Sequence, residues 1–163
     1  IGAVGLSGVD CGLFTGVGVE SGNLTGRITA TNPAILHQLA RAGLVPVVSS
    51  VSCDAAGTTG LNINADDAAL ALAVAVKASC LIYLSDIPGI LKDGKVLPVV
   101  TPAIAERETE AGVISGGMIP KVQSSLAALA EGIGRIVIGG YQQAGDLAKF
   151  LDASLGTSIT KDE

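Results

Sequence analysis

Short apolar runs, each closed by glycine, serine or proline, recur along the chain at the length of single strands. Ile1 to Leu6 ends at Ser7-Gly8, which predicts a buried strand that opens into a glycine-rich loop. Leu44 to Val51 is rich in β-branched residues, which predicts a strand buried on both faces. The same pattern predicts three more strands, at Cys80 to Leu84, Arg135 to Ile138 and Thr157 to Thr160.

Helical patterns fill the intervals between these runs. Asn32-Pro33 supplies a cap and a proline for the first helical position, and apolar residues follow at helical spacing up to Gly43. Asp66 and Asp67 precede an alanine-rich stretch that ends at Lys77, which puts two carboxylates at the positive end of a helix dipole. Three further helices are predicted at Thr101 to Glu110, Pro120 to Ala130 and Ala144 to Leu151.

Turn residues complete the arrangement. Asp93-Gly94 between two apolar pairs predicts a hairpin, and Val17 to Val19 pairs with Arg27 to Thr29 as another. A loop with Gly57 and Gly60 follows the second predicted strand. Strands that alternate with helices imply right-handed crossovers and a mainly parallel sheet covered on both faces. We therefore expect an α/β fold in a single domain over residues 1–163, with ligands at the carboxyl ends of the strands.

Composition narrows the function classes. Of the 163 residues, 48% are hydrophobic and 15% are charged, which allows a real core in one domain. The net charge of −5 and the lack of a Lys/Arg cluster argue against a nucleic-acid partner. The longest apolar run, Ala68 to Val76, is far shorter than the roughly 20 residues of a membrane span. Three widely spaced cysteines suit buried thiols in a reducing, cytoplasmic compartment.

Polar residues concentrate in four loops that follow predicted strands: Ser7 to Gly12, Asn62 to Asp67, Ser85 to Gly89 and Ser115 to Lys121. These loops are predicted to converge on one crevice. Each also has a plain structural explanation, since an aspartate at a helix start is more often a cap than a catalyst. Lys121 follows Gly116-Gly117 at a predicted helix start, where backbone amides favour an anion, although an exposed lysine on a solvated face fits the same pattern.

Other candidate sites fail on their context. Gly89 to Lys95 has the spacing of a Walker phosphate loop, but Val96 replaces the hydroxyl residue and the following residues read as a strand. His37 is the only histidine and has no nucleophile near it in the sequence, so a Ser-His-Asp mechanism lacks its base. Three glutamates of one predicted helix are interpreted as a solvated face: Glu106, Glu108 and Glu110.

Three motifs carry a resemblance to a known family. Asn62 to Asp66, Leu84 to Gly89 and Gly116 to Lys121 resemble, in order and spacing, the acetylglutamate kinases of the amino acid kinase family. Ala3 to Gly8 and the helix at Asn32-Pro33 are similar too, so the resemblance covers essentially the whole chain. It implies a three-layer αβα sandwich and transfer of the γ-phosphoryl of ATP, with Mg²⁺, to the side-chain carboxylate of N-acetyl-L-glutamate in arginine biosynthesis.

The resemblance also implies roles for individual residues. Lys121 is similar to the lysine that stabilises the transferring phosphoryl group, Asp66 to the aspartate that orients the catalytic lysines, and Asn62 to the residue that holds the acylated amino acid. No side chain is assigned as a metal ligand. The segments that resemble the surroundings of the nucleotide are Asp86, Ile87, Pro88, Gly89, Ile90 and Leu91, together with Val113, Ile114 and Ser115.

Departures from the family pattern keep alternatives open. Val9 stands where the family usually has a lysine, before the aspartate matched by Asp10. The family's N-terminal lysine, glycine-rich loop and substrate arginine have no counterpart, so the chain is expected to be a C-terminal portion and a poor catalyst alone. The alternatives are a relative that acts on aminoadipate, aspartate or carbamate, and a nucleotide-binding regulatory module without turnover. A homo-oligomer is expected for the complete enzyme.

Overall fold

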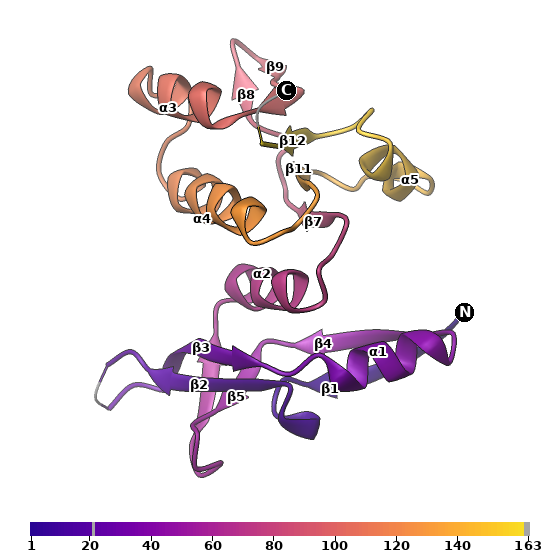
Figure 1. Ribbon diagram of the computed structural model, residues 1–163. Coiled ribbons are helices and arrows are strands. Elements are labelled where there is room, and N and C mark those ends of the chain that lie inside the picture. Colours follow the sequence, from indigo (N-terminus) through magenta and orange to yellow (C-terminus); the bar gives the residue numbers. More distant parts are fainter. Residues whose placement is uncertain (21, 162–163) are drawn as a thin grey trace. The chain divides into compact units, whose positions relative to one another are not determined.

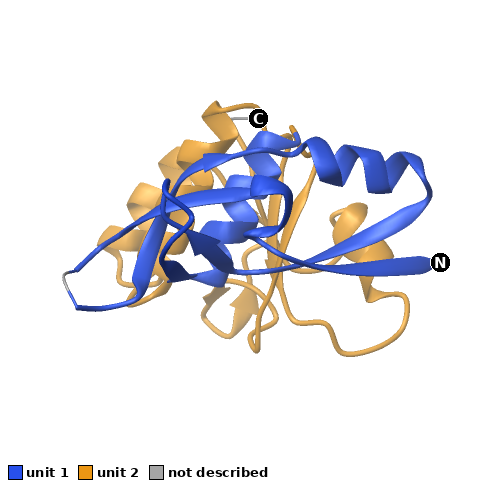
Figure 2. Ribbon diagram, turned by 90° about the horizontal axis from the view of Figure 1, so that it is seen from below, with its two compact units in different colours: residues 1–76 blue, residues 77–163 orange. Residues whose placement is uncertain are grey.

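The computed structural model describes residues 1–20 and 22–161 and confirms the α/β class (Figure 1). Its contacts divide the chain into two compact units, residues 1–76 and 77–163, each of which is described by itself (Figure 2). The division into two units does not test whether residues 1–163 form a single domain, so that organisation stays a prediction.

A parallel pair of strands opens the first unit. β1, Gly2–Ser7, pairs with β4, Leu44–Ser49, and the helix α1, Ala34–Arg41, lies between them in sequence. The predicted start of α1 is off by one residue, because the helix begins at Ala34 and Pro33 occupies the N-cap position without a side-chain cap; the side chain of Asn32 accepts a hydrogen bond from the Ala34 N–H at 3.2 Å just before it. Asp10 fixes the loop after β1 by accepting a bond from the Ser7 N–H at 2.7 Å.

The prediction that the second strand is buried on both faces is wrong. Side chains along β4 alternate between half-buried and exposed positions, and those of Val45 and Val47 are 46% and 58% exposed. Val48 packs against the core of this unit, which includes Leu36 of α1. Within the described residues, β4 therefore buries one face only. The predicted strand also ends at Ser49, and Val51 starts a strand of another sheet.

A small closed barrel forms the second sheet of the first unit. Its strands are β2, Phe14–Gly18; β3, Thr25–Thr31; β5, Val51–Cys53; and β6, Gly60–Ile63. β2 and β3 pair antiparallel, as the predicted hairpin required, and a 3-10 turn at Asp10–Gly12 precedes them. The core cluster consists of Leu13, Phe14, Leu36, Leu61, Ile63 and Ala68.

A four-stranded sheet organises the second unit. Its order is β10, Val99–Val100; β12, Thr157–Ile159; β11, Ile136–Gly139; and β7, Leu81–Leu84. β7 and β11 are parallel, as are β10 and β12, whereas β11 and β12 are antiparallel. In Figure 1, α4 and α5 lie on opposite sides of β11. The helices are α3, Pro102–Glu110; α4, Met118–Ala130; and α5, Asp146–Leu151, and the hairpin is β8, Leu91–Lys92, with β9, Lys95–Val96.

The thiols are less buried than predicted. All three cysteines are free, Cys53 and Cys80 are half-buried, and Cys11 is exposed. Cys11 lies in the short 3-10 turn after β1 with a φ of 53°, and none of the residues of that turn is buried. In the part of the chain that the structure describes, no helix has the length and apolar character needed to cross a membrane.

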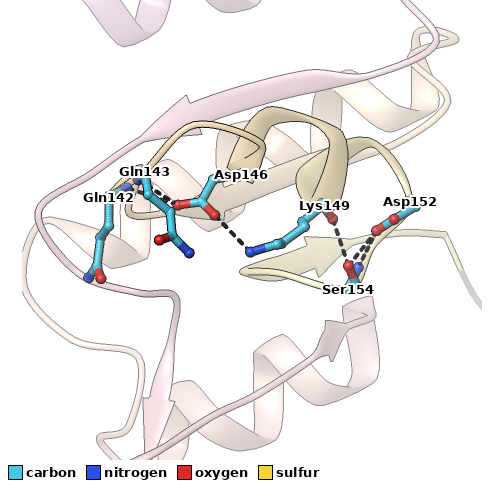
Figure 3. A network of polar contacts seen from close by, with 6 residues as sticks. All are labelled: Gln142, Gln143, Asp146, Lys149, Asp152 and Ser154. Atoms are coloured by element: carbon cyan, nitrogen blue, oxygen red, sulfur yellow. Dashed lines mark hydrogen bonds and ion pairs between the residues drawn. The ribbon is translucent and has the colours of Figure 1, made fainter.

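A buried aspartate holds the turn that leads into α5 (Figure 3). One carboxylate oxygen of Asp146 accepts hydrogen bonds from the N–H groups of Gln142 and Gln143, both at 3.0 Å, and the other accepts from Lys149 Nζ at 3.0 Å. These bonds, with that from Gln142 the largest contribution, lower the pKa of Asp146. The carboxylate therefore stays ionised to lower pH in the folded chain than in the unfolded chain.

We expect Asp146→Asn to flatten the acid side of the stability profile. Because folding lowers this pKa, its stabilisation is fully present above the ordinary aspartate pKa of about 3.9 and is lost as pH falls through the folded value. The slope of unfolding free energy against pH should lose the contribution of less than one proton. Urea unfolding between neutral and acidic pH measures it. Glu106→Gln, at an exposed position of α3, is the control, and equal slopes for both variants would contradict the prediction.

Candidate active site

The strand β6 and the start of α2, Ala65–Ala75, carry the two candidate residues of the first unit. Asn62 lies in β6, where its N–H donates to Leu24 O at 2.7 Å, so the loop predicted for residues 62–67 is wrong at its start. The side chain of Asn64 caps α2 by accepting from the N–H groups of Asp66 and Asp67, at 2.9 and 3.3 Å. The cap is therefore Asn64, and Asp66 lies in the first helical turn without being the cap.

The loop after β7 carries the first predicted nucleotide segment, residues 86–91. Its start is fixed to the neighbouring strand, because the Ser85 N–H donates to Gly139 O at 2.9 Å. The loop then passes close to Gly140, where an added Cβ would lie 3.3 Å from Ile87 O. The hydroxyl of Ser85 also donates to Asp86 Oδ1 at 3.1 Å. The segment thus lies at the carboxyl ends of the parallel strands β7 and β11, where ligands of such sheets bind.

The far end of the same segment is held by β12. Thr157 Oγ1 accepts a hydrogen bond from the Ile90 N–H at 2.8 Å, in a buried position. Gly89 has a φ of 153°, and a Cβ added there would lie 2.8 Å from that same hydroxyl. Only glycine fits this approach without a shift of β12. Thr157 lies 67 residues from Ile90, so no local pattern could indicate the pair.

The second predicted nucleotide segment, residues 113–115, follows α3 and is tied to one glutamate. The N–H groups of Val113 and Ile114 both donate to the main-chain carbonyl of Glu108, at 2.9 and 3.0 Å. The side chain of Glu108 accepts from Lys92 Nζ at 2.8 Å, and Lys92 directly follows the first segment. Glu108 therefore links the residue after the first segment to the first two residues of the second segment, within the second unit.

The prediction that the glutamates of α3 lie on a solvated face is wrong for Glu108. Its side chain is fully buried, and Ala105, three residues earlier on the same helix face, is buried as well. Glu106 and Glu110 are exposed, as predicted. The buried alanine at helical spacing was the available signal that residue 108 faces inward.

Lys121 lies one turn into α4, whose first position follows Gly117 without a side-chain cap. Its Nζ lies 5.1 Å from the ring centroid of Tyr83, a buried residue of β7, which is the geometry of a cation–π contact. Lys121 is half-buried, unlike the exposed lysine of the alternative interpretation. Tyr83 was missed because its contact joins two elements far apart in the sequence.

The remaining sequence candidates are resolved by their position. Gly94 and Lys95 lie in the β8–β9 hairpin, so no helix follows them as a Walker loop requires. His37 is exposed on α1. Among residues 1–20 and 22–161, no three histidine, cysteine or acidic side chains are grouped so that they could hold a metal ion. Asn62 and Asp66 belong to the first unit, and Lys121 and both nucleotide segments belong to the second.

Comparisons with known proteins fit this arrangement. The model of the amino acid kinase family matches residues 1–140. The chain is 44% identical over 138 residues to an acetylglutamate kinase of Geobacillus stearothermophilus, covering 83% of this chain and 53% of the relative. It is 39% identical over 162 residues to that of Chlorobaculum parvum, covering 96% and 54%. A solved structure of a protein from Streptococcus mutans UA159 superposes with a TM-score of 0.80 at 27% identity, over 99% of this chain and 62% of that one.

The chain thus spans about half the length of the curated relatives it matches. The family match nevertheless extends over residues 1–140, which include Asn62, Asp66, Lys121 and both predicted nucleotide segments. On this match, and on the 44% identity to a curated acetylglutamate kinase over 83% of this chain, the chain belongs to the amino acid kinase family.

Proposed function

We propose that this chain supplies the nucleotide-binding and phosphoryl-stabilising part of an acetylglutamate kinase. The observation that carries the proposal is the cluster in the second unit, where Glu108 links Lys92, next to the segment 86–91, to the segment 113–115, and Lys121 in the first turn of α4 contacts Tyr83 of β7. The names of relatives up to 44% identical support the acceptor, N-acetyl-L-glutamate. A cytoplasmic location, supported by three free thiols, and a homo-oligomeric complete enzyme belong to the same proposal.

The proposed reaction forms one bond and breaks one bond at phosphorus. An oxygen of the acceptor's side-chain carboxylate attacks the γ-phosphorus of ATP, the bond to the β,γ-bridging oxygen breaks, and ADP leaves with that electron pair. A loose transition state spreads negative charge over three equatorial oxygens. Lys121 supplies positive charge to them, Asp66 organises the catalytic lysines, and Asn62 holds the acylated amino acid. Positioning and charge are what this chemistry requires of a protein.

Mg²⁺ enters this proposal as the partner of the nucleotide phosphates. Magnesium in kinases is usually held by substrate phosphates and one or two carboxylates, with several waters retained. The described residues offer no cluster of three acidic, histidine or cysteine ligands, so a dedicated protein cage does not fit. When bound, the ion neutralises phosphate charge, and no step assigned here to a side chain depends on its placement.

Calorimetric titration of the chain with magnesium-ATP tests the nucleotide part of the proposal. We expect binding by the wild-type chain, weaker binding by Lys121→Ala, and unchanged binding by Lys77→Ala, which removes an exposed lysine of the same unit. An absence of binding by folded wild-type chain would refute the nucleotide site. Equal weakening by both variants would show a general effect of charge rather than a phosphate contact.

The acceptor is tested in the complete gene product. Acyl phosphates react with hydroxylamine to give hydroxamates, so hydroxamate formation with N-acetyl-L-glutamate, compared with aminoadipate-type, aspartate and carbamate acceptors, identifies the substrate. A preference for another acceptor would move the protein elsewhere in the family. Nucleotide binding without turnover on any acceptor would favour the regulatory module.

Tyr83 gives a further prediction for the proposed reaction. Tyr83→Leu removes the ring beneath Lys121 Nζ, whereas Tyr83→Phe keeps it. Since a cation–π contact contributes about 0.5–2 kcal/mol, we expect Tyr83→Leu to lower kcat about two- to thirtyfold relative to Tyr83→Phe. Steady-state kinetics of the complete gene product measures this. Equal kcat values for the two variants would show that the ring does not place the lysine.

A further inference from the structure

Glu108 is a buried glutamate that is paired with two cations and lies in the last turn of α3. Its side chain is fully buried, one carboxylate oxygen accepts from both Lys92 Nζ and the Arg107 guanidinium, and the main-chain carbonyl accepts from two successive N–H groups. The distances from Oε1 are 2.8 Å to Lys92 and 2.9 Å to Arg107 Nε. Among the described side chains, Glu108 Oε2 is one of the buried polar atoms without a hydrogen-bond partner.

Stability alone is a poor explanation for this arrangement. Burial of a carboxylate is costly, and exchange of a buried ion pair for well-packed apolar residues is often neutral or stabilising. The unpaired Oε2 adds to that cost, because a buried polar atom without a partner is expensive. The cations are only partly covered, with 40% of the Lys92 side chain and 66% of the Arg107 side chain exposed. A buried polar group retained at such a cost calls for a role other than packing.

The two ends of Glu108 reach the two predicted nucleotide segments. Its carboxylate holds Lys92, the residue after the segment 86–91, and its carbonyl holds the N–H groups that open the segment 113–115. The hydrogen bond from Lys92, followed by that from Arg107, lowers the pKa of Glu108, so the link remains charged through neutral pH.

We infer that Glu108 is a positioning residue that fixes the spacing of the two nucleotide-binding segments, acting through Lys92 on one side and through its own carbonyl on the other. The inference rests on the proposed nucleotide site. It makes nucleotide affinity depend on a carboxylate that the nucleotide does not touch, since Oε2 is closed off from solvent.

The test is magnesium-ATP affinity of the full 163-residue chain, measured by calorimetry, with thermal unfolding in parallel. We expect Lys92→Met to raise Kd about tenfold, with Lys92→Arg restoring most of the affinity because it keeps the cation. Lys95→Met is the matched control, since Lys95 is the cross-strand partner of Lys92 in the same hairpin and is exposed. A Kd for Lys92→Met equal to that of Lys95→Met overturns the inference.

Glu108→Gln completes the design. If the link acts as inferred, Glu108→Gln weakens binding to a similar extent, and the Glu108→Gln and Lys92→Met double variant is no weaker than either single variant. Additive losses, or losses that follow the unfolding temperature across all variants, overturn the inference. If Glu108→Gln does not fold, the comparison between the lysine variants still decides. If the folded wild-type chain does not bind magnesium-ATP, the result refutes the proposed function, and this inference with it.

Discussion

Lys121→Ala is expected to lower kcat of the complete gene product by about a hundred- to a thousandfold, the range found when one preorganised donor to transition-state charge is removed. The physical reason is that its Nζ, held above Tyr83 at the start of α4, would neutralise charge that develops on the transferring phosphoryl group. A smaller effect on the KM for ATP is expected, because this contact strengthens in the transition state.

We expect the fold to survive this substitution, because Lys121 is only half-buried and alanine is a good helix former. Circular dichroism and thermal unfolding of the variant provide the check, with Lys77→Ala as the matched control. Turnover within a factor of two of wild type in a folded Lys121→Ala protein would remove Lys121 from the proposed mechanism.

Asp66→Asn is expected to lower kcat about ten- to a hundredfold, the range typical of residues that orient a primary group, while magnesium-ATP affinity stays nearly unchanged. The side chain that caps α2 is that of Asn64 and not that of Asp66, so the variant keeps the start of α2. Steady-state kinetics and calorimetry on the same preparation separate the two quantities.

Asp67→Asn is an unusually close control for this experiment. Like Asp66→Asn, it replaces one carboxylate of the first helical turn by an amide, and it therefore changes the interaction with the helix dipole in the same way. Equal losses in the two variants would reduce the effect to helix electrostatics. A loss confined to nucleotide affinity would argue against an organising role for Asp66.

The elements predicted correctly are those whose signals are local. The Thr101-Pro102 start was predicted correctly because a cap and a helical proline act within four residues, and Thr101 Oγ1 does accept from the Ile104 N–H. The start predicted at Asn32-Pro33 is correct to within one residue. The Asp93-Gly94 turn was found for the same reason, and both its residues have positive φ. Local chemistry therefore determined helix starts and the tight hairpin.

The missed features depend on contacts between distant residues. β6 was read as part of a loop because Gly60 and Asn62 occupy its exposed positions, although Leu61 and Ile63 alternate with them as buried residues. Glu108 was assigned to solvent because its partner Lys92 lies 16 residues away, on a hairpin. Patterns within one element cannot show which charges tertiary contacts will pair.

The candidate site follows the same division. The motifs located the segments 86–91 and 113–115 from residues that lie next to one another in the chain. They could not locate Thr157 or Tyr83, which hold those segments and Lys121 from other elements. Sequence alone thus predicted the residues proposed to touch ligands, whereas the residues that support them required the fold.

The half-buried strand β4 has a practical consequence for anyone who purifies this chain. Within the described residues, β1 and β4 form a two-stranded sheet, so each strand has an open edge, and Val45 and Val47 are exposed beside it. Open edges with apolar side chains promote aggregation between molecules. Pro46 lies within the strand and has no N–H to offer to another chain, which is the property of a gatekeeper residue. Replacing Pro46 by an ordinary residue should therefore make the isolated chain less soluble before it changes anything at the nucleotide site.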